Sequence, residues 1–331
     1  MGFIRCCLLV VAIVAATACL AQDGGGTVTF ENASARVTFS GTFYPGTAQP
    51  PYPVILILSG HGPHGTSPQS ALGRLLNDSG YATLSYDEKR ADVLTFDRAG
   101  RVDMVSDTEA AIAYLKGRPD VDPKRIGLFG SSAGAVVASA VAAQDPSVAF
   151  LILTGMPAEG AAKARGRLIA ELARKKGCEQ EEIDALAADF RAVIADDGGP
   201  ADMRRLAARM VSDKLITRET ADNLLEQYDT PGARALLTYD SAADLRNLGV
   251  PILALYGSLD MQAPPDANIP ALLTAVEGKP AVSVIVLPGL DHSLRDAGTD
   301  DTPAGNRSRG EPFTGTGVFQ AITHWLAAKG P

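Results

Sequence analysis

From residue 27 onward, hydrophobic and polar positions first alternate and then give way to a continuous apolar run. Residues 27–30 and 35–39 alternate polar and apolar side chains, which predicts two strands of an antiparallel hairpin. A proline-rich connector at 45–53 follows, and then residues 54–58 form a continuous apolar run. Such a run is typical of a central parallel strand that is buried on both faces.

Beyond this run, segments with helical spacing alternate with short apolar segments of strand length. The expected helices cover about 69–78, 104–116, 133–143, 269–276 and 318–328, and the expected strands cover 81–86, 125–129, 148–153, 251–256 and 282–287. This rhythm predicts βαβ units, and therefore an α/β fold with a mostly parallel central sheet and helices on both faces.

One long block interrupts the strand–helix rhythm. Residues 157–246 are rich in Ala, Leu, Arg and Glu, and their apolar positions recur with helical spacing, as at Ile183, Leu186 and Phe190. The block therefore predicts a helical cap inserted into a core that is formed by residues 27–156 and 247–331.

The N-terminal segment is typical of a secretory signal peptide. A positive charge precedes an apolar run at 8–16, and small residues follow. We therefore expect a signal peptide within residues 1–21, cleaved after Ala18 or after Ala21. The run is too short for a membrane span. The expected location is secreted or periplasmic, with a lipoprotein anchored at Cys19 as the alternative.

Composition narrows the range of partners. The formal net charge of -8 provides no attraction to nucleic acid or to an anionic membrane surface. Of the four cysteines, only Cys178 lies clearly beyond the targeting segment, so neither an internal disulfide nor a thiolate zinc cluster is expected. Cys178 is expected to be a partly buried residue on a helix. Composition does not determine the oligomeric state.

The strongest chemical signal is a G-x-S-x-G motif formed by Gly130, Ser132 and Gly134. It follows a predicted strand and opens a predicted helix, which is the context of a nucleophile elbow. The two glycines remove Cβ atoms that would clash in so tight a turn, and the helix N-terminus favours developing negative charge. Ser132 is therefore the expected nucleophile, and Ser131 is its neighbour.

A serine nucleophile needs a base and an acid, and in this arrangement both follow it in the order acid, then histidine. Only His292 and His324 follow Ser132, and only His292 lies in a loop after a predicted strand. Asp260 comes directly after the preceding strand and is the expected acid. Asp291, next to His292, cannot easily fold back onto its ring.

An oxyanion hole would complete this site. One expected donor is the backbone N–H of Ala133, directly after the nucleophile. The other is the backbone N–H of His61, in the glycine-rich segment that follows the first buried strand. The chemistry needs no metal and no organic cofactor.

These residues carry a family resemblance that covers nearly the whole mature chain. Segment 60–63 resembles the oxyanion loop of the α/β-hydrolases, and segment 85–90 resembles their Arg-Tyr-Asp-Lys-Arg-Gly segment. Segments 230–240, 251–260 and 288–292 resemble the end of the cap, the acid loop and the histidine loop. More narrowly, the chain is similar to bacterial esterases with a helical cap that are related to dienelactone hydrolases and S9-type peptidases. It departs from that group at 131–135 and at Ala91, and both changes affect the shape of the pocket.

The expected function is therefore that of a secreted serine esterase acting on small-molecule carboxylic esters. The resemblance implies short acyl chains and an α/β-hydrolase fold. A peptidase or amidase with the same three residues is one alternative. A non-catalytic binding protein on the same fold is the other.

Overall fold

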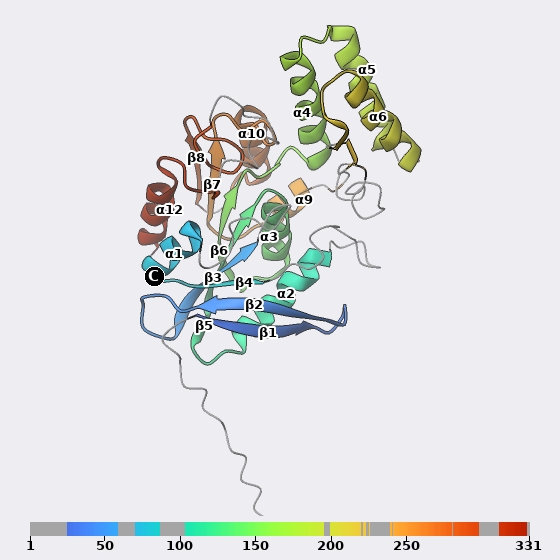
Figure 1. The fold of residues 1–331 in the computed structure, drawn as a ribbon. Helices are drawn as coiled ribbons and strands as arrows, with labels where there is room; N and C mark the ends of the chain where they lie inside the picture. The colour runs from blue at the N-terminus through green and yellow to red at the C-terminus, as the bar shows by residue number, and fades with distance from the viewer. Residues whose placement is uncertain are drawn as a thin grey trace, which may run out of the picture.

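A central eight-stranded sheet organises the protein, as seen in a computed structural model (Figure 1). The structure describes residues 25–58, 70–86, 103–194, 199–219, 221–222, 225, 239, 241–279, 281–297 and 311–329. The strand order is β1-β2-β4-β3-β5-β6-β7-β8. The strands are β1 (Gly26–Asn32), β2 (Val37–Tyr44), β3 (Tyr52–Leu58), β4 (Ala82–Tyr86), β5 (Val121–Ser131), β6 (Val148–Thr154), β7 (Ile252–Gly257) and β8 (Val282–Leu287).

Strand direction divides the sheet into two parts. β1 pairs antiparallel with β2, with Gly26 opposite Phe43, and β2 pairs antiparallel with β4. Every other pair, from β4 across to β8, is parallel. The predicted hairpin and the predicted mostly parallel sheet are thus confirmed.

Helices cover both faces of the sheet because alternate side chains of each strand point to opposite sides. On β3, Val54, Leu56 and Leu58 join one apolar cluster, and Ile55 and Ile57 join another. The first cluster lies under α2 (Asp103–Lys116), α3 (Ala133–Gln144), α9 (Ser241–Asn247) and α10 (Pro265–Ala275). The second lies under α1 (Ala71–Asp78) and α12 (Val318–Ala327).

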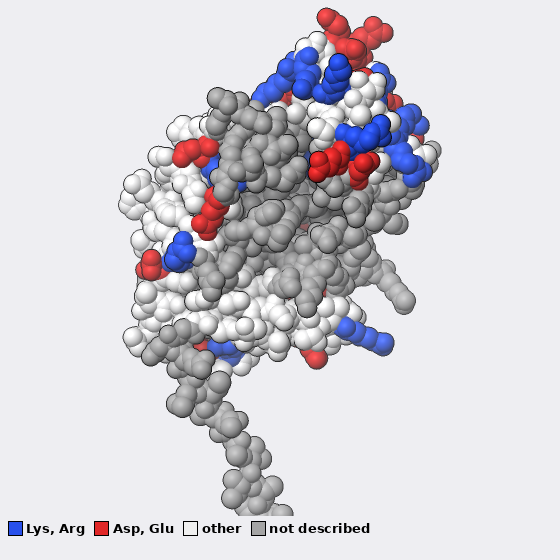
Figure 2. Space-filling view, viewed as in Figure 1, with Lys and Arg blue, Asp and Glu red and all other residues white. Residues whose placement is uncertain are grey.

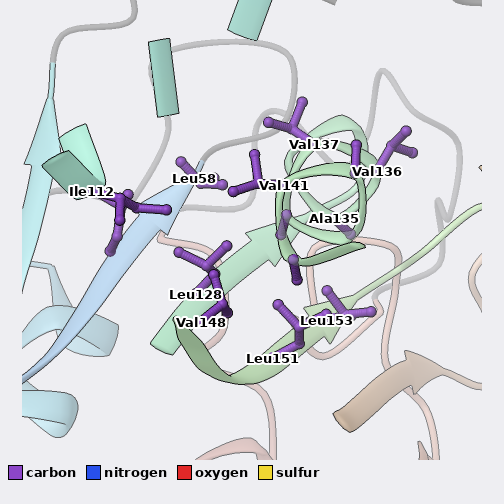
Figure 3. Close-up of a cluster of buried hydrophobic side chains, with 14 of the residues drawn as sticks. Leu58, Ile112, Leu128, Ala135, Val136, Val137, Val141, Val148, Leu151 and Leu153 are labelled. Atoms are coloured by element: carbon purple, nitrogen blue, oxygen red, sulfur yellow. The ribbon is translucent and has the colours of Figure 1, made fainter. Parts of the chain in front are cut away.

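Helix α3 is the most deeply packed helix of this core. Every residue from Ala133 to Ala142 is buried. Figure 3 shows Ala135 and Val141 of α3 above Leu128 of β5 and Leu151 of β6. A helix that is apolar all round is a buried helix, so α3 holds its own N-terminus firmly in place.

Two elements, β5 and α10, begin four residues earlier than the pattern predicts. β5 starts at Val121 rather than at 125, because Val121 pairs with Tyr52 across an irregularity that accommodates the intervening polar residues. α10 starts at Pro265 rather than near 269. Proline is favoured in the first turn of a helix, where its missing N–H costs nothing, and apolar periodicity does not reveal such a start.

The insertion forms a separate layer of helices with its own apolar cluster. α4 (Ala161–Lys175), α5 (Gln180–Val193) and α6 (Pro200–Ser212) pack around residues such as Leu186, Phe190 and Leu206. α9, although it lies within the expected cap segment 157–246, packs on the core through Leu245. Among the described residues, no helix has both the length and the apolar character needed to cross a bilayer.

Cys178 corrects one detail of the sequence analysis. It is a free, partly buried cysteine, as expected, but it lies in the turn between α4 and α5 rather than on a helix. It packs against the apolar cluster of the insertion. The helical spacing continued across this turn, where Gly177 adopts a φ of 78° and ends α4.

Candidate active site

The residues expected to carry the chemistry follow three of four neighbouring parallel strands of the sheet. Ser132 follows β5, Asp260 follows β7 and His292 follows β8, and Gly155 follows the intervening β6. Because β5, β6, β7 and β8 are neighbours and run parallel, their carboxyl ends meet at one edge of the sheet. Ligand sites of open α/β sheets lie at this edge.

Ser132 has the strained backbone of a sharp strand-to-helix turn. Its φ is 54° and its ψ is -115°, a combination that residues with a side chain rarely adopt. A Cβ atom on Gly130 would lie 2.5 Å from the carbonyl oxygen of Gly134, so the first turn of α3 can approach β5 this closely only with glycine at 130. The Ser132 N–H donates to the Thr154 carbonyl at 2.9 Å, which ties the turn to β6.

Ala133 occupies the first position of α3. The N–H groups in the first turn of a helix have no acceptor within the helix, and the positive end of the helix dipole lies there. This N–H is therefore placed for an oxyanion beside Ser132. His61, the other expected donor, lies outside the described residues.

Asp260 is held in one orientation by three hydrogen bonds. The side chain is buried, and its Oδ1 accepts the backbone N–H groups of Gln262 and Ala263, each at 2.8 Å. Its Oδ2 lies 2.8 Å from Nδ1 of His292. The loop after β7 thus folds back on its own carboxylate and aims the second oxygen at the imidazole.

His292 is buried against this carboxylate. Burial is the largest influence on the pKa of His292 and lowers it, but the charge and hydrogen bond of Asp260 outweigh burial and raise the pKa above its ordinary value. Asp291 raises the pKa further, and Arg165 of the insertion lowers it. With Nδ1 donating to Asp260, Nε2 is the ring nitrogen that can accept a proton.

Asp291 has a structural task instead of contacting the imidazole of His292. Its Oδ1 accepts the backbone N–H groups of Ser293 at 2.8 Å and Arg295 at 3.0 Å, and its Oδ2 lies 3.5 Å from Nε of Arg295. These contacts close the loop that carries His292. His324, the other histidine after Ser132, is exposed on α12.

Three side chains near the site were missed by sequence reasoning. Tyr256 of β7 donates its hydroxyl to the Met156 carbonyl at 3.0 Å, and burial raises its pKa well above the ordinary value. Lys175 of α4 places Nζ 3.3 Å from Sδ of Met261, next to Asp260. Arg165, also on α4, acts electrostatically on His292. The positions of the two α4 residues near the site could not be predicted locally, because helical spacing does not determine which loop of the core a helix faces.

The insertion is also anchored to the core at its base. The Glu159 N–H donates to Oδ1 of Asn268 on α10 at 3.2 Å, and Arg167 pairs with the Glu159 carboxylate at 3.0 Å. The first contact holds the start of the insertion beside α10, and the second ties α4 to the same residue. Within the described part of the chain, no group of three or more His, Cys, Asp or Glu side chains has a metal-binding arrangement.

Comparison with known proteins agrees with this architecture. Residues 43–303 match the profile of the Alpha/beta hydrolase family, which covers most of the chain, so this chain belongs to that family. An uncharacterized protein of Mycobacterium tuberculosis is 32% identical over 112 residues, which is 34% of this chain and 39% of the relative. The alignment thus spans about two fifths of that relative's length.

Solved structures share the fold at low sequence identity. Est1E from Butyrivibrio proteoclasticus is 15% identical with a TM-score of 0.53, and the match covers 92% of this chain and 98% of Est1E. The esterase domain of a Rhodothermus marinus protein is 18% identical with a TM-score of 0.51, at 92% and 98% coverage. An acylaminoacyl peptidase of Pyrococcus horikoshii is 15% identical with a TM-score of 0.54, and the match covers 93% of this chain and 42% of the peptidase. The expected α/β-hydrolase fold is therefore confirmed.

Proposed function

We propose that this chain is a serine esterase that hydrolyses small carboxylic esters through an acyl-enzyme on Ser132. The observation that carries the proposal is the buried Asp260–His292 pair, with its 2.8 Å contact, at the sheet edge where the strained Ser132 also lies. A nucleophile, a base and an orienting acid from three loops at one sheet edge form the arrangement that acyl transfer requires.

In the proposed reaction, Oγ of Ser132 attacks the ester carbonyl while Nε2 of His292 takes the hydroxyl proton. Asp260 holds the imidazole and stabilises its positive charge. The oxyanion receives hydrogen bonds from the N–H groups of Ala133 and His61. The imidazolium returns its proton to the departing alcohol. Water then attacks the acyl-enzyme with His292 again as base, which releases the acid and restores Ser132.

The insertion is proposed to set the size of the acyl group. Its helix α4 lies near the acid loop through the Lys175–Met261 contact, and its Arg165 acts on His292. The same three catalytic residues could also cleave an amide, and some proteins that share the fold are peptidases. Esters are favoured because the match covers 98% of Est1E and of the Rhodothermus marinus esterase domain, but only 42% of the Pyrococcus horikoshii peptidase.

The decisive test is turnover of a p-nitrophenyl ester series, from acetate to long acyl chains, by wild type and Ser132→Ala. Loss of the serine hydroxyl is expected to lower kcat by about 10⁶-fold. Ser139→Ala is the matched control, because Ser139 is a buried serine on the same helix whose hydroxyl donates to the Ala135 carbonyl. Its turnover should stay near that of wild type.

The outcomes separate the alternatives. Turnover that persists in a folded Ser132→Ala variant would overturn the proposed nucleophile. A wild type that cleaves a matched amide faster than the ester would make the protein an amidase. A folded wild type that neither turns over any ester nor reacts with a fluorophosphonate would indicate a binding protein.

We also propose export of the mature protein, on the basis of the signal-peptide pattern at 1–21. Intact mass spectrometry of the protein recovered outside the cytoplasm tests this proposal. A mass corresponding to cleavage after Ala18 or Ala21 supports a processed form, and a lipid adduct on Cys19 indicates the lipoprotein. A full-length, cytoplasmic product would contradict export.

A further inference from the structure

The four parallel strands that end at the candidate active site do not contribute equally to it. β5, β7 and β8 are each followed by a residue with a chemical side chain, Ser132, Asp260 and His292. β6, which lies between β5 and β7, is followed by Gly155. Gly155 therefore stands between the nucleophile and the acid, at the point where the chain leaves the sheet for the insertion.

We propose that Gly155 is a positioning residue of the active site, whose missing side chain creates the space in which the His292 imidazole stands. This inference rests on the proposed esterase function. A Cβ atom on residue 155 would lie 2.8 Å from Cε1 and 2.9 Å from Nδ1 of His292, and 3.4 Å from Oδ2 of Asp260. Optimal contacts between carbon atoms are about 3.5–4.0 Å, so the imidazole and a side chain at 155 exclude each other.

The backbone at residue 155 cannot easily move away. The Gly155 N–H donates to the Leu255 carbonyl at 3.0 Å, which joins it to β7. On either side, the Thr154 carbonyl accepts the Ser132 N–H at 2.9 Å and the Met156 carbonyl accepts the Tyr256 hydroxyl at 3.0 Å. The segment is thus held by three hydrogen bonds to β7 and to the nucleophile turn.

The acid cannot move away either, so the imidazole is the group that must shift. Asp260 is buried and fixed by two backbone N–H groups. His292 can respond by rotating its side chain, which lengthens its contact with Asp260 and moves Nε2 relative to Ser132. The steric effect of a side chain at residue 155 is therefore expected to reach catalysis through the imidazole.

Gly155 has a second reason to be glycine, and the test must separate the two. Its φ of +54° is unfavourable for any residue with a Cβ atom. Gly278 is the matched control, because its φ is +72° and a Cβ atom there meets nothing within 4 Å. Gly278→Ala therefore introduces the backbone strain without the collision.

The experiment compares wild type, Gly155→Ala, Gly278→Ala and Ser132→Ala on p-nitrophenyl acetate. Misplacement of a catalytic group by about 1 Å can cost about 10²-fold in rate, so Gly155→Ala is expected to lower kcat by about 10- to 100-fold with KM little changed. The downfield proton resonance of the His292–Asp260 hydrogen bond is expected to shift or broaden in Gly155→Ala. Gly278→Ala should leave both the rate and the resonance unchanged.

A double-mutant cycle measures the interaction between residue 155 and His292 through stability and needs no enzyme assay. Gly155→Ala is made in wild type and in His292→Ala, and unfolding by urea is measured for all four proteins. Removing the imidazole ring removes the collision, so Gly155→Ala should lower the unfolding midpoint less in the His292→Ala background. If Gly155→Ala alone fails to fold, recovery of a folded double variant gives the same support.

Failure of the inference is distinct from failure of the proposed function. A kcat of Gly155→Ala within about twofold of wild type, or equal losses in both backgrounds of the cycle, overturns the role of Gly155. Full activity of Ser132→Ala instead overturns the proposed esterase mechanism, and the unfolding cycle then still decides whether Gly155 and His292 exclude each other.

Discussion

The sheet core and the helical insertion manage polar groups in opposite ways. The described core buries Asp260, Asp291, His292 and Arg295 around one edge of the sheet, and its strands β3 and β7 are apolar throughout. The insertion exposes many charged side chains, which gather in the upper part of the molecule in Figure 2. In its ion pairs Arg174–Glu171 and Arg205–Asp202, the arginines are exposed and the acidic partners are partly exposed.

The contrast shows which charged groups can influence a neighbouring catalytic side chain. Exposed ion pairs are screened by water and salt, and each contributes about 0–1 kcal/mol to stability. A buried pair such as Asp260–His292 is screened far less, and leaving one partner alone is costly. A carboxylate in the core can therefore control a neighbouring imidazole, and a carboxylate of the insertion mainly keeps a helix surface soluble.

Replacing one carboxylate in each region tests this contrast most directly. Asp260→Asn is expected to lower kcat by about 10⁴-fold, because the amide no longer holds the imidazole in the required tautomer. Asp189→Asn, which removes a partner of Arg209 in the insertion, should leave kcat unchanged. Steady-state kinetics with the p-nitrophenyl esters checks both, and equal losses in the two variants would contradict the division.

Deleting a buried leucine in each region tests whether the two apolar clusters are independent. Leu128→Ala in the core and Leu186→Ala in the insertion each remove a fully buried side chain and should cost about 2–5 kcal/mol where they act. The core change is expected to lower the global free energy of unfolding. The insertion change is expected to open α4–α6 locally while the sheet stays folded.

Hydrogen exchange distinguishes these two responses. In Leu186→Ala, exchange should speed up in α4, α5 and α6 and remain slow in α3 and β5. Matching acceleration throughout both regions would show that the insertion and the core unfold as one cooperative unit.

The pH dependence tests how a charge of the insertion, that of Arg165, affects the core. His292 must be neutral to act as a base, and its pKa is raised by Asp260, so kcat/KM should fall as the pH drops through that raised value. Arg165 lowers the pKa of His292. Arg165→Gln should therefore raise the pKa and move the acid limb of the profile to higher pH.

Arg174→Gln is the control on the same helix. Arg174 is exposed and pairs with Glu171, three residues before it, so the acid limb should stay in place. The pH profile of kcat/KM for the three proteins, measured at low ionic strength, gives the comparison. An unmoved acid limb in Arg165→Gln would mean that the charge of the insertion does not reach the imidazole.

The smallest expected effect concerns the surface ion pairs themselves. Arg205→Gln removes contacts to Asp202 and Asp189 and should change the free energy of unfolding by about 0–1 kcal/mol. Added salt should remove the difference, because these charges are exposed. Urea unfolding at low and high salt checks this result, and a loss above about 2 kcal/mol at both salt concentrations would contradict it.

Local sequence patterns were enough to predict most elements of the core and the strand-to-helix turn at Ser132. A continuous apolar run such as 54–58 predicts a strand covered on both faces, and Gly130 and Gly134 around Ser132 predict a tight strand-to-helix turn. Both signals lie within a few neighbouring residues. These predictions hold because β3, α3 and the turn between β5 and α3 adopt the structures that their local sequences favour.

Contacts between distant segments were decided only by the tertiary structure. The 2.8 Å contact of Asp260 with His292, the packing of Gly155 against the same ring and the approach of Arg165 join loops and helices that the sequence keeps apart. The position of β3 between β4 and β5 is of the same kind. Periodicity indicates which face of a helix or strand is apolar. Which segment packs against that face depends on strand pairing and close packing over the whole chain.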